Sequence, residues 1–121
     1  METISRNEIF NHLQRGDGIR LVEALPENFY DAGHLPGAIA IPMGFVADLA
    51  PRLLPDKKQV IVVYCSGSIC QNSLHVAEEL QQLGYAAVRR YIEGKEDWKQ
   101  AGLPMEAAGT PAPAELADAL P

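Results

Sequence analysis

The run from Val60 to Tyr64, VIVVY, constrains the fold of this 121-residue chain more than any other segment. β-Branched and aromatic residues favour an extended backbone, and the run has no polar residue that would face solvent. Such a strand is typical of a parallel sheet covered by helices on both faces. The chain is long enough for one domain with its own core. We therefore expect residues 60–64 to form the buried central strand of such a sheet.

Strand and helix patterns alternate along the rest of the sequence. Short apolar runs predict three further strands, at Ile19–Ala24, Ala38–Ile41 and Ala87–Tyr91. Amphipathic spacing predicts helices that begin after Ser5 and that cover Phe45–Leu53 (broken at Pro51), Asn72–Leu83 and Glu96–Ala101. Alternating strands and helices form right-handed βαβ units. The predicted fold class is therefore α/β, a three-layer sandwich with a central, mainly parallel sheet flanked by helices.

Cys65 follows the central strand directly, and a short loop (residues 66–69) separates it from a second cysteine, Cys70, at the start of the next helix. A thiol held where a strand turns into a helix lies at the positive end of the helix dipole. Unpaired N–H groups there can bind a thiolate or an oxyanion. This position favours a reactive Cys65 over the alternative, a buried packing residue at a strand end.

Composition and charge narrow the class of partner. The net charge of −6 and the pI near 4.9 oppose nucleic-acid binding, which requires basic patches. No apolar run approaches the ~18 residues of a membrane span, and the N-terminal residues do not resemble a signal peptide. Two cysteines are too few for a disulfide scaffold. We therefore predict a cytoplasmic protein with two free thiols, no nucleic-acid partner and no membrane partner.

Several motifs, in the right order, resemble those of the rhodanese-like domain family. Tyr30–Ala38 (YDAGHLPGA) resembles the family's G-H-[IL]-P-G-A turn, and Val60–Cys65 resembles its central strand ending in the catalytic cysteine. Leu83–Tyr85 and Glu93–Pro104 resemble its final strand–helix signature, which usually ends in W-x-x-A-G-L-P. The resemblance implies the rhodanese-like fold, consistent with the α/β sandwich predicted above.

The resemblance extends over most of the chain, roughly from Ile4 to Met105. It implies one rhodanese-like domain over residues 1–105. The remaining residues, 106–121, are rich in alanine and proline. We expect them to form a flexible C-terminal tail.

The resemblance implies a sulfurtransferase. In the family, the cysteine accepts a sulfane sulfur from a small donor, holds it as a persulfide and passes it to a thiol or cyanide acceptor; a protein acceptor is a further alternative. Here Cys65 would be the catalytic residue, and no cofactor is implied. The backbone of the loop would form the anion cradle, contributed by Ser66, Gly67, Ser68, Ile69 and Cys70. Such a cradle would lower the pKa of Cys65 from the ordinary value of about 8.5.

The chain departs from the family in its charges. Many members carry a D-x-R triplet at the end of the first strand. This chain has Glu23-Ala24-Leu25 there, so the arginine is missing. Many also have basic residues in the catalytic loop, which is uncharged here. Thiosulfate is a dianion and loses charge-assisted contacts at a neutral loop, so a persulfide or polysulfide donor is favoured. Arg89, Arg90 and Lys95 are the candidates to replace the missing charge.

Cys70 has three interpretations. It is a resolving thiol that attacks a Cys65 persulfide, a second sulfur carrier, or a small apolar residue that packs at the helix start. The alternative function for the whole chain is a non-catalytic or redox-sensing interaction module that uses the Cys65/Cys70 pair.

Other residues carry weaker signals. His34 precedes Pro36-Gly37 in a turn, where a structural hydrogen bond is favoured over a catalytic base. Three scattered histidines and two cysteines do not have the spacing of a zinc site, so no metal is expected. Tyr91 and Trp98 are expected in the core. Gln71 occupies the position where a C-x5-R phosphatase needs arginine, which excludes that activity.

Overall fold

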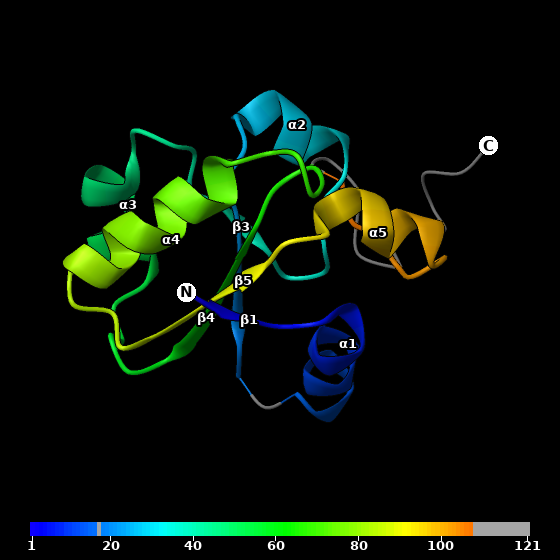
Figure 1. Ribbon diagram of the computed structural model, residues 1–121, viewed down its shortest axis with the longest axis horizontal. Coiled ribbons are helices and arrows are strands. Elements are labelled where there is room, and N and C mark those ends of the chain that lie inside the picture. The colour runs from blue at the N-terminus through cyan, green and yellow to red at the C-terminus, as the bar shows by residue number, and fades with distance from the viewer. Residues whose placement is uncertain (17, 108–121) are drawn as a thin grey trace, which may run out of the picture.

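The structure is a computed structural model, and it describes residues 1–16 and 18–107. These residues form the α/β fold shown in Figure 1. The strands are β1 (Glu2–Thr3), β2 (Arg20–Glu23), β3 (Ile39–Ala40), β4 (Val60–Tyr64) and β5 (Ala87–Tyr91). The helices are α1 (Arg6–Arg15), α2 (Glu27–Ala32), α3 (Val46–Leu53), α4 (Asn72–Gln82) and α5 (Gly94–Gln100).

The five strands form one parallel sheet in the order β1-β5-β4-β2-β3. The predicted central strand, β4, lies in the middle of this order, as expected. Its last residue, Tyr64, pairs with Glu23 of β2 and with Tyr91 of β5. The carboxyl ends of three neighbouring strands therefore meet at one edge of the sheet, and Cys65 follows the central one.

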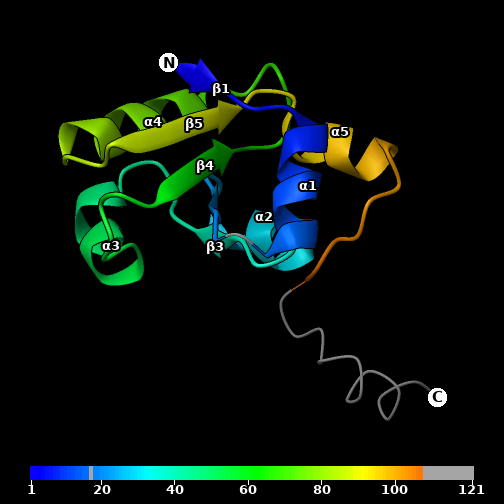
Figure 2. The ribbon, with the colours of Figure 1, turned by 90° about the horizontal axis from the view of Figure 1, so that it is seen from below.

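Helices cover both faces of the sheet, which confirms the three-layer prediction (Figure 2). Alternate residues of β4 point in opposite directions. Ile61 and Val63 pack in one core cluster with residues of α3 and α4, whereas Val62 and Tyr64 pack in a second with residues of α1 and α5. The unbroken apolar run of β4 is thus explained by burial on both faces.

The predicted helices are present, with one correction. Pro51 does not break the helix at 45–53; α3 continues through it. A proline there removes a single N–H donor, and the flanking turns persist because Leu49 N–H and Leu54 N–H bond the carbonyls of Phe45 and Ala50 at 3.0 and 2.8 Å. Among the helices of the described residues, none is long and apolar enough to cross a membrane.

The tail predicted at 106–121 begins with a residue that is bound to the domain. Glu106 forms an antiparallel bridge with His34, through N–H···O bonds of 2.7 and 2.8 Å. Its carboxylate also accepts a hydrogen bond from the Gly37 N–H at 2.9 Å. The segment 108–121 lies outside the described residues, and the domain boundary at 105 stays a prediction.

Candidate functional site

The N-terminus of α5 holds the start of the Cys65–Cys70 loop. The Lys95 N–H donates to the Cys65 carbonyl at 2.9 Å, and the Glu96 N–H donates to the Ser66 carbonyl at 2.8 Å. This close approach requires glycine at position 94, where φ is +69° and a Cβ would lie 2.5 Å from the Cys65 carbonyl oxygen. Two helix N–H groups thereby fix the backbone at the predicted nucleophile.

Arg90 of β5 holds the other end of the loop. Arg90 is 8% exposed, and its guanidinium donates from Nη2 to the Cys70 carbonyl at 3.2 Å and from Nε to Ser73 Oγ at 2.8 Å. The Cys65 sulfur lies 3.3 Å from the same Cys70 carbonyl oxygen. The two cysteines are thus brought together across the loop.

The two thiols are hydrogen-bonded to each other and differ in environment. Cys65 is 1% exposed, whereas Cys70 is partly exposed. The Ser73 hydroxyl and N–H donate to the Cys65 sulfur, while the N–H groups of Asn72 and Ser66 donate to the Cys70 sulfur. Asn72 and Ser73 begin α4, whose first N–H groups have no partners within the helix.

These environments overturn the expectation that the pKa of Cys65 is lowered. Burial raises the pKa of the Cys65 thiol, and its donation to Cys70 adds to the rise, outweighing the opposing bonds from Ser73. Burial also acts to raise the pKa of Cys70, but the Cys65 thiol and the loop N–H groups donate to it and leave that pKa lowered. Cys70 is therefore the more acidic thiol of the two.

The middle of the loop faces outward. Ser68 is exposed and Ile69 is 92% exposed. Gly67 is buried against the exposed side chain of Glu96, where a Cβ would lie 2.7 Å from a carboxylate oxygen. The predicted cradle thus has an apolar side chain at its tip and a carboxylate at its edge, and this setting disfavours an anionic donor.

The three candidates for the missing basic charge have different partners. Arg89 pairs with Glu2 and Glu8 at 3.3 and 3.8 Å, near β1 and α1. Lys95 donates from Nζ to Glu23 and to the Phe29 carbonyl, both at 3.0 Å. Of these candidates, Arg90 is the one whose side chain hydrogen-bonds to the loop, and it does so at the backbone of Cys70.

Glu23 and Lys95 form a buried ion pair that the sequence did not reveal. Glu23 is fully buried, and its carboxylate accepts hydrogen bonds from Lys95 Nζ at 3.0 Å and from the Tyr64 hydroxyl at 2.8 Å. The Tyr64 hydroxyl in turn accepts from the Leu35 N–H at 3.1 Å. Burial and the adjacent Glu23 charge raise the pKa of Tyr64, which stays a neutral donor. The network ties β2, β4 and α5 together beneath the loop.

The remaining candidates have the structural roles that their positions predict. His34 stacks on the Tyr30 ring, and its Nδ1 lies 2.8 Å from the Tyr30 carbonyl oxygen. Tyr91 and Trp98 are fully buried. Within residues 1–16 and 18–107, no cluster of three or more His, Cys, Asp or Glu side chains could hold a metal ion.

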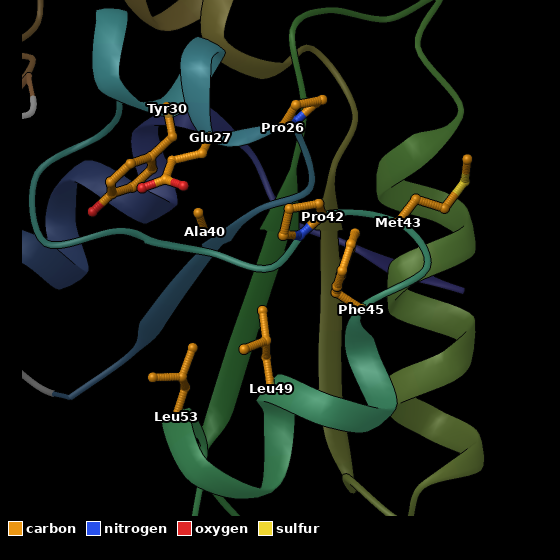
Figure 3. A pocket seen from close by; sticks show the side chains of 9 residues that line it. All are labelled: Pro26, Glu27, Tyr30, Ala40, Pro42, Met43, Phe45, Leu49 and Leu53. Carbon is orange, nitrogen blue, oxygen red and sulfur yellow. The ribbon is translucent and has the colours of Figure 1, made fainter.

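A surface cavity of about 580 Å³ lies between α2, β3 and α3 (Figure 3). Its walls are mainly apolar: Pro26, Glu27, Tyr30, Ala40, Pro42, Met43, Phe45, Leu49 and Leu53. No residue of the 65–70 loop is among these lining residues of the described chain. The two thiols therefore lie outside this cavity, in a setting formed by backbone groups.

The family model of the rhodanese-like domain matches residues 5–101. The chain belongs to the rhodanese-like domain family. This match spans strands β2 to β5, the loop with both cysteines and all of α5.

The known proteins to which the chain is similar differ in how much of their length it covers. The HTH-type transcriptional regulator Rv0324 of Mycobacterium tuberculosis is 34% identical over 105 residues, which are 87% of this chain and 45% of that protein. This chain therefore spans less than half of that relative. The BH2092 protein from Bacillus halodurans has a TM-score of 0.81 and 29% identity, over 88% of this chain and 77% of that one. A thiosulfate sulfurtransferase from Pseudomonas aeruginosa has a TM-score of 0.79 over 88% of this chain and 20% of that one; its 21% identity supports the fold alone.

Proposed function

We propose that this rhodanese-like domain is a sulfurtransferase that carries sulfane sulfur as a persulfide on Cys65. The observation that carries the proposal is the position of Cys65 at the end of β4, in a loop whose start is held by α5 and whose end is held by Arg90. N–H groups at the start of α4 donate to both cysteine sulfurs and can bind a persulfide anion. The two cysteines are free, which is consistent with a reducing compartment, and we propose that the protein is cytoplasmic.

The transfer takes place in two displacements. The Cys65 sulfur attacks the outer sulfur of a persulfide R–S–SH, the S–S bond of the donor breaks, and R–S⁻ leaves. Cys70, which accepts a hydrogen bond from the Cys65 thiol, takes its proton during the attack. An acceptor thiolate then attacks the outer sulfur of the Cys65 persulfide, and Cys65 leaves as a thiolate. Once deprotonated, the thiol of higher pKa is the stronger sulfur nucleophile, so sulfur loading on Cys65 depends on this proton transfer to Cys70.

The electrostatics of the loop favour a persulfide or polysulfide donor over thiosulfate. The loop carries no cationic side chain, and Glu96 places a carboxylate against Gly67. A dianionic donor approaching this edge is repelled, and it gains no charge-assisted contact from a loop side chain. The exposed Ile69 side chain suits a donor or acceptor with an apolar portion.

Intact mass spectrometry tests the proposal. The protein is incubated with glutathione persulfide, with polysulfide or with thiosulfate, desalted, and then treated with a thiol acceptor. We expect one added sulfur atom, on the wild type or on Cys70→Ser, that maps to Cys65, is lost to the acceptor and does not form on Cys65→Ser. The absence of an adduct with all three donors, in both the wild type and Cys70→Ser, would show that the domain does not transfer sulfur.

The relative that is a transcriptional regulator favours a second candidate function, a redox-sensing module without transfer activity. In that case the Cys65/Cys70 pair would respond to an oxidant, forming a disulfide with the loss of two hydrogen atoms. Hydrogen peroxide in place of the sulfur donor separates the two. A disulfide formed with peroxide, together with no sulfur adduct from any donor, would support the module instead of the enzyme.

A further inference from the structure

The loop contains a second thiol that sulfur transfer through Cys65 does not use as a nucleophile. Cys70 lies five residues after Cys65, yet the Cys65 sulfur lies 3.3 Å from the Cys70 carbonyl oxygen and close enough to the Cys70 sulfur to hydrogen-bond with it. Both ends of the loop are held, by the Lys95 N–H at the Cys65 carbonyl and by Arg90 at the Cys70 carbonyl. A persulfide on Cys65 would therefore form beside the Cys70 sulfur.

We infer that Cys70 is a resolving thiol, which reduces the Cys65 persulfide to sulfide and leaves a Cys65–Cys70 disulfide. This inference rests on the proposed function, because it needs a persulfide on Cys65. It adds a second outcome to the reaction: the sulfur is released as sulfide when no acceptor thiol takes it.

The step balances in atoms and electrons. The Cys70 thiolate attacks Cys65 Sγ, a bond forms between the two cysteine sulfurs, and the bond from Sγ to the outer sulfur breaks. The outer sulfur leaves with that electron pair and the persulfide proton, as HS⁻. The sulfane sulfur gains two electrons, and the two cysteine sulfurs each lose one. A dithiol reductant, small or protein-bound, then reduces the disulfide and regenerates both thiols.

The environments of the two thiols match these roles. The attacking group must be ionised and accessible. Cys70 is partly exposed, and the Ser66 and Asn72 N–H groups and the Cys65 thiol donate to its sulfur, which lowers its pKa. Cys65 is buried, so its Sγ, the atom that Cys70 attacks, is shielded from solvent thiols. Attack from within the loop therefore competes well with attack from outside.

A packing role does not account for all the contacts of Cys70. Cys70 does pack against a core cluster, and burial acts to raise its pKa. Its sulfur also accepts hydrogen bonds from the Cys65 thiol and from the Ser66 and Asn72 N–H groups. A second-carrier role would require attack on the outer sulfur of the persulfide, and would leave that sulfur bonded to Cys70.

A single-turnover experiment tests the inference. Wild type, Cys70→Ser and Cys65→Ser, each fully reduced, receive one equivalent of glutathione persulfide without oxygen and are desalted rapidly. Free sulfide and intact mass are then followed with time, and dithiothreitol is added at the end. We expect wild type to release one equivalent of sulfide and lose two hydrogen atoms, with both thiols restored by dithiothreitol. Cys70→Ser should keep the added sulfur on Cys65 until dithiothreitol releases it, and Cys65→Ser should do neither.

Each other result has a defined meaning. A wild-type persulfide on Cys65 that persists as long as in Cys70→Ser would overturn the resolving role and leave the sulfurtransferase intact. An added sulfur that maps to Cys70 would replace the resolving role with a carrier role. The absence of an adduct on both wild type and Cys70→Ser would overturn the proposed function and this inference together. If Cys70→Ser fails to fold, peptide mapping of a Cys65–Cys70 disulfide in treated wild type, absent from untreated protein, still decides the matter.

Discussion

Arg90 donates a hydrogen bond from Nη2 to the carbonyl oxygen of Cys70, at 3.2 Å. This bond joins the end of β5 to the end of the loop that begins at Cys65. The guanidinium is almost fully buried and does not line an open donor-binding surface. We therefore assign Arg90 a positioning role, in which it fixes the backbone on which Cys70 is carried.

Arg90→Lys tests this positioning role. Lysine keeps the charge but cannot reproduce the two directed bonds to Ser73 and to the Cys70 carbonyl. We expect a loss of about 2 kcal/mol in urea unfolding, since hydrogen bonds to charged groups contribute about 1.5–3 kcal/mol. The Cys70 alkylation rate should also change. The control is Arg89→Lys, because the neighbouring Arg89 forms surface ion pairs. This variant should change the free energy of unfolding by less than about 1 kcal/mol. Equal effects of the two variants would contradict the assignment.

Glu96→Gln tests whether the carboxylate beside Gly67 selects against anionic donors. Removing one negative charge at the loop edge should raise kcat/KM for thiosulfate by about threefold at low salt, and less at high salt. The value for glutathione persulfide, which carries less charge near its reacting sulfur, should change less. Initial rates with both donors at two ionic strengths provide the measurement. A thiosulfate rate that is insensitive to this substitution would leave the uncharged loop itself as the cause of the selectivity.

The order of thiol acidity predicts which cysteine is alkylated first. A thiol reacts with iodoacetamide as its thiolate. The lowered pKa of Cys70 places the midpoint of its rate-versus-pH curve below the ordinary value of about 8.5. Burial and the raised pKa of Cys65 place its midpoint above that value. Peptide mass spectrometry across pH 5 to 10 should thus find Cys70 modified first at neutral pH. Preferential modification of Cys65 would reverse this order of acidity.

Replacing one partner of the Glu23–Lys95 ion pair should lower the free energy of unfolding more than replacing both. Glu23→Gln leaves the Lys95 ammonium, whose side chain is 12% exposed, without its countercharge. Breaking a buried pair on one side costs about 3–5 kcal/mol, and urea unfolding should register a loss of about 3 kcal/mol here. The double variant Glu23→Gln/Lys95→Met should recover part of it. Additive losses in this double-mutant cycle would mean that the two residues do not interact.

The sheet is predictable from sequence because its buried strands carry local patterns. The apolar run of β4 and the shorter runs of β2, β3 and β5 each mark a strand within a few residues. β1 has no such pattern: it has two residues, both exposed, and it is defined by backbone pairing with Arg89 and Arg90. Tertiary pairing, rather than side-chain burial, makes this strand.

The candidate site is predictable only in part. The position of Cys65 follows from its adjacency to β4, but the order of thiol acidity depends on which N–H groups approach each sulfur. The bond between Lys95 and Glu23 joins residues that are 72 positions apart in the sequence, and no local sequence pattern predicts such a contact. The sequence offered one signal for the N–H groups of Asn72 and Ser73. Both residues begin a predicted helix, and the first N–H groups of a helix lack partners within it.

Gly94→Ala tests whether the close packing of α5 on the loop is needed for function. Alanine at a positive φ is unfavourable by about 1–2 kcal/mol, and here its Cβ would also lie 2.5 Å from the Cys65 carbonyl oxygen and 2.9 Å from the Gly67 nitrogen. Because both contacts are with backbone, the loop must shift. We expect a further loss of about 1–3 kcal/mol in urea unfolding, together with a large drop in the rate of persulfide formation on Cys65.

Gly102→Ala is the matched control for this variant. Gly102 has a similar positive φ of +72°, but a Cβ there would meet no atom within 4 Å. It should therefore show the backbone penalty alone and keep the wild-type rate of persulfide formation. The difference between the two variants isolates the contact with the loop, because the conformational penalty is common to both. If Gly94→Ala and Gly102→Ala lose the same stability and retain the same rate, the loop tolerates displacement, and the contact between α5 and Cys65 does not position the nucleophile.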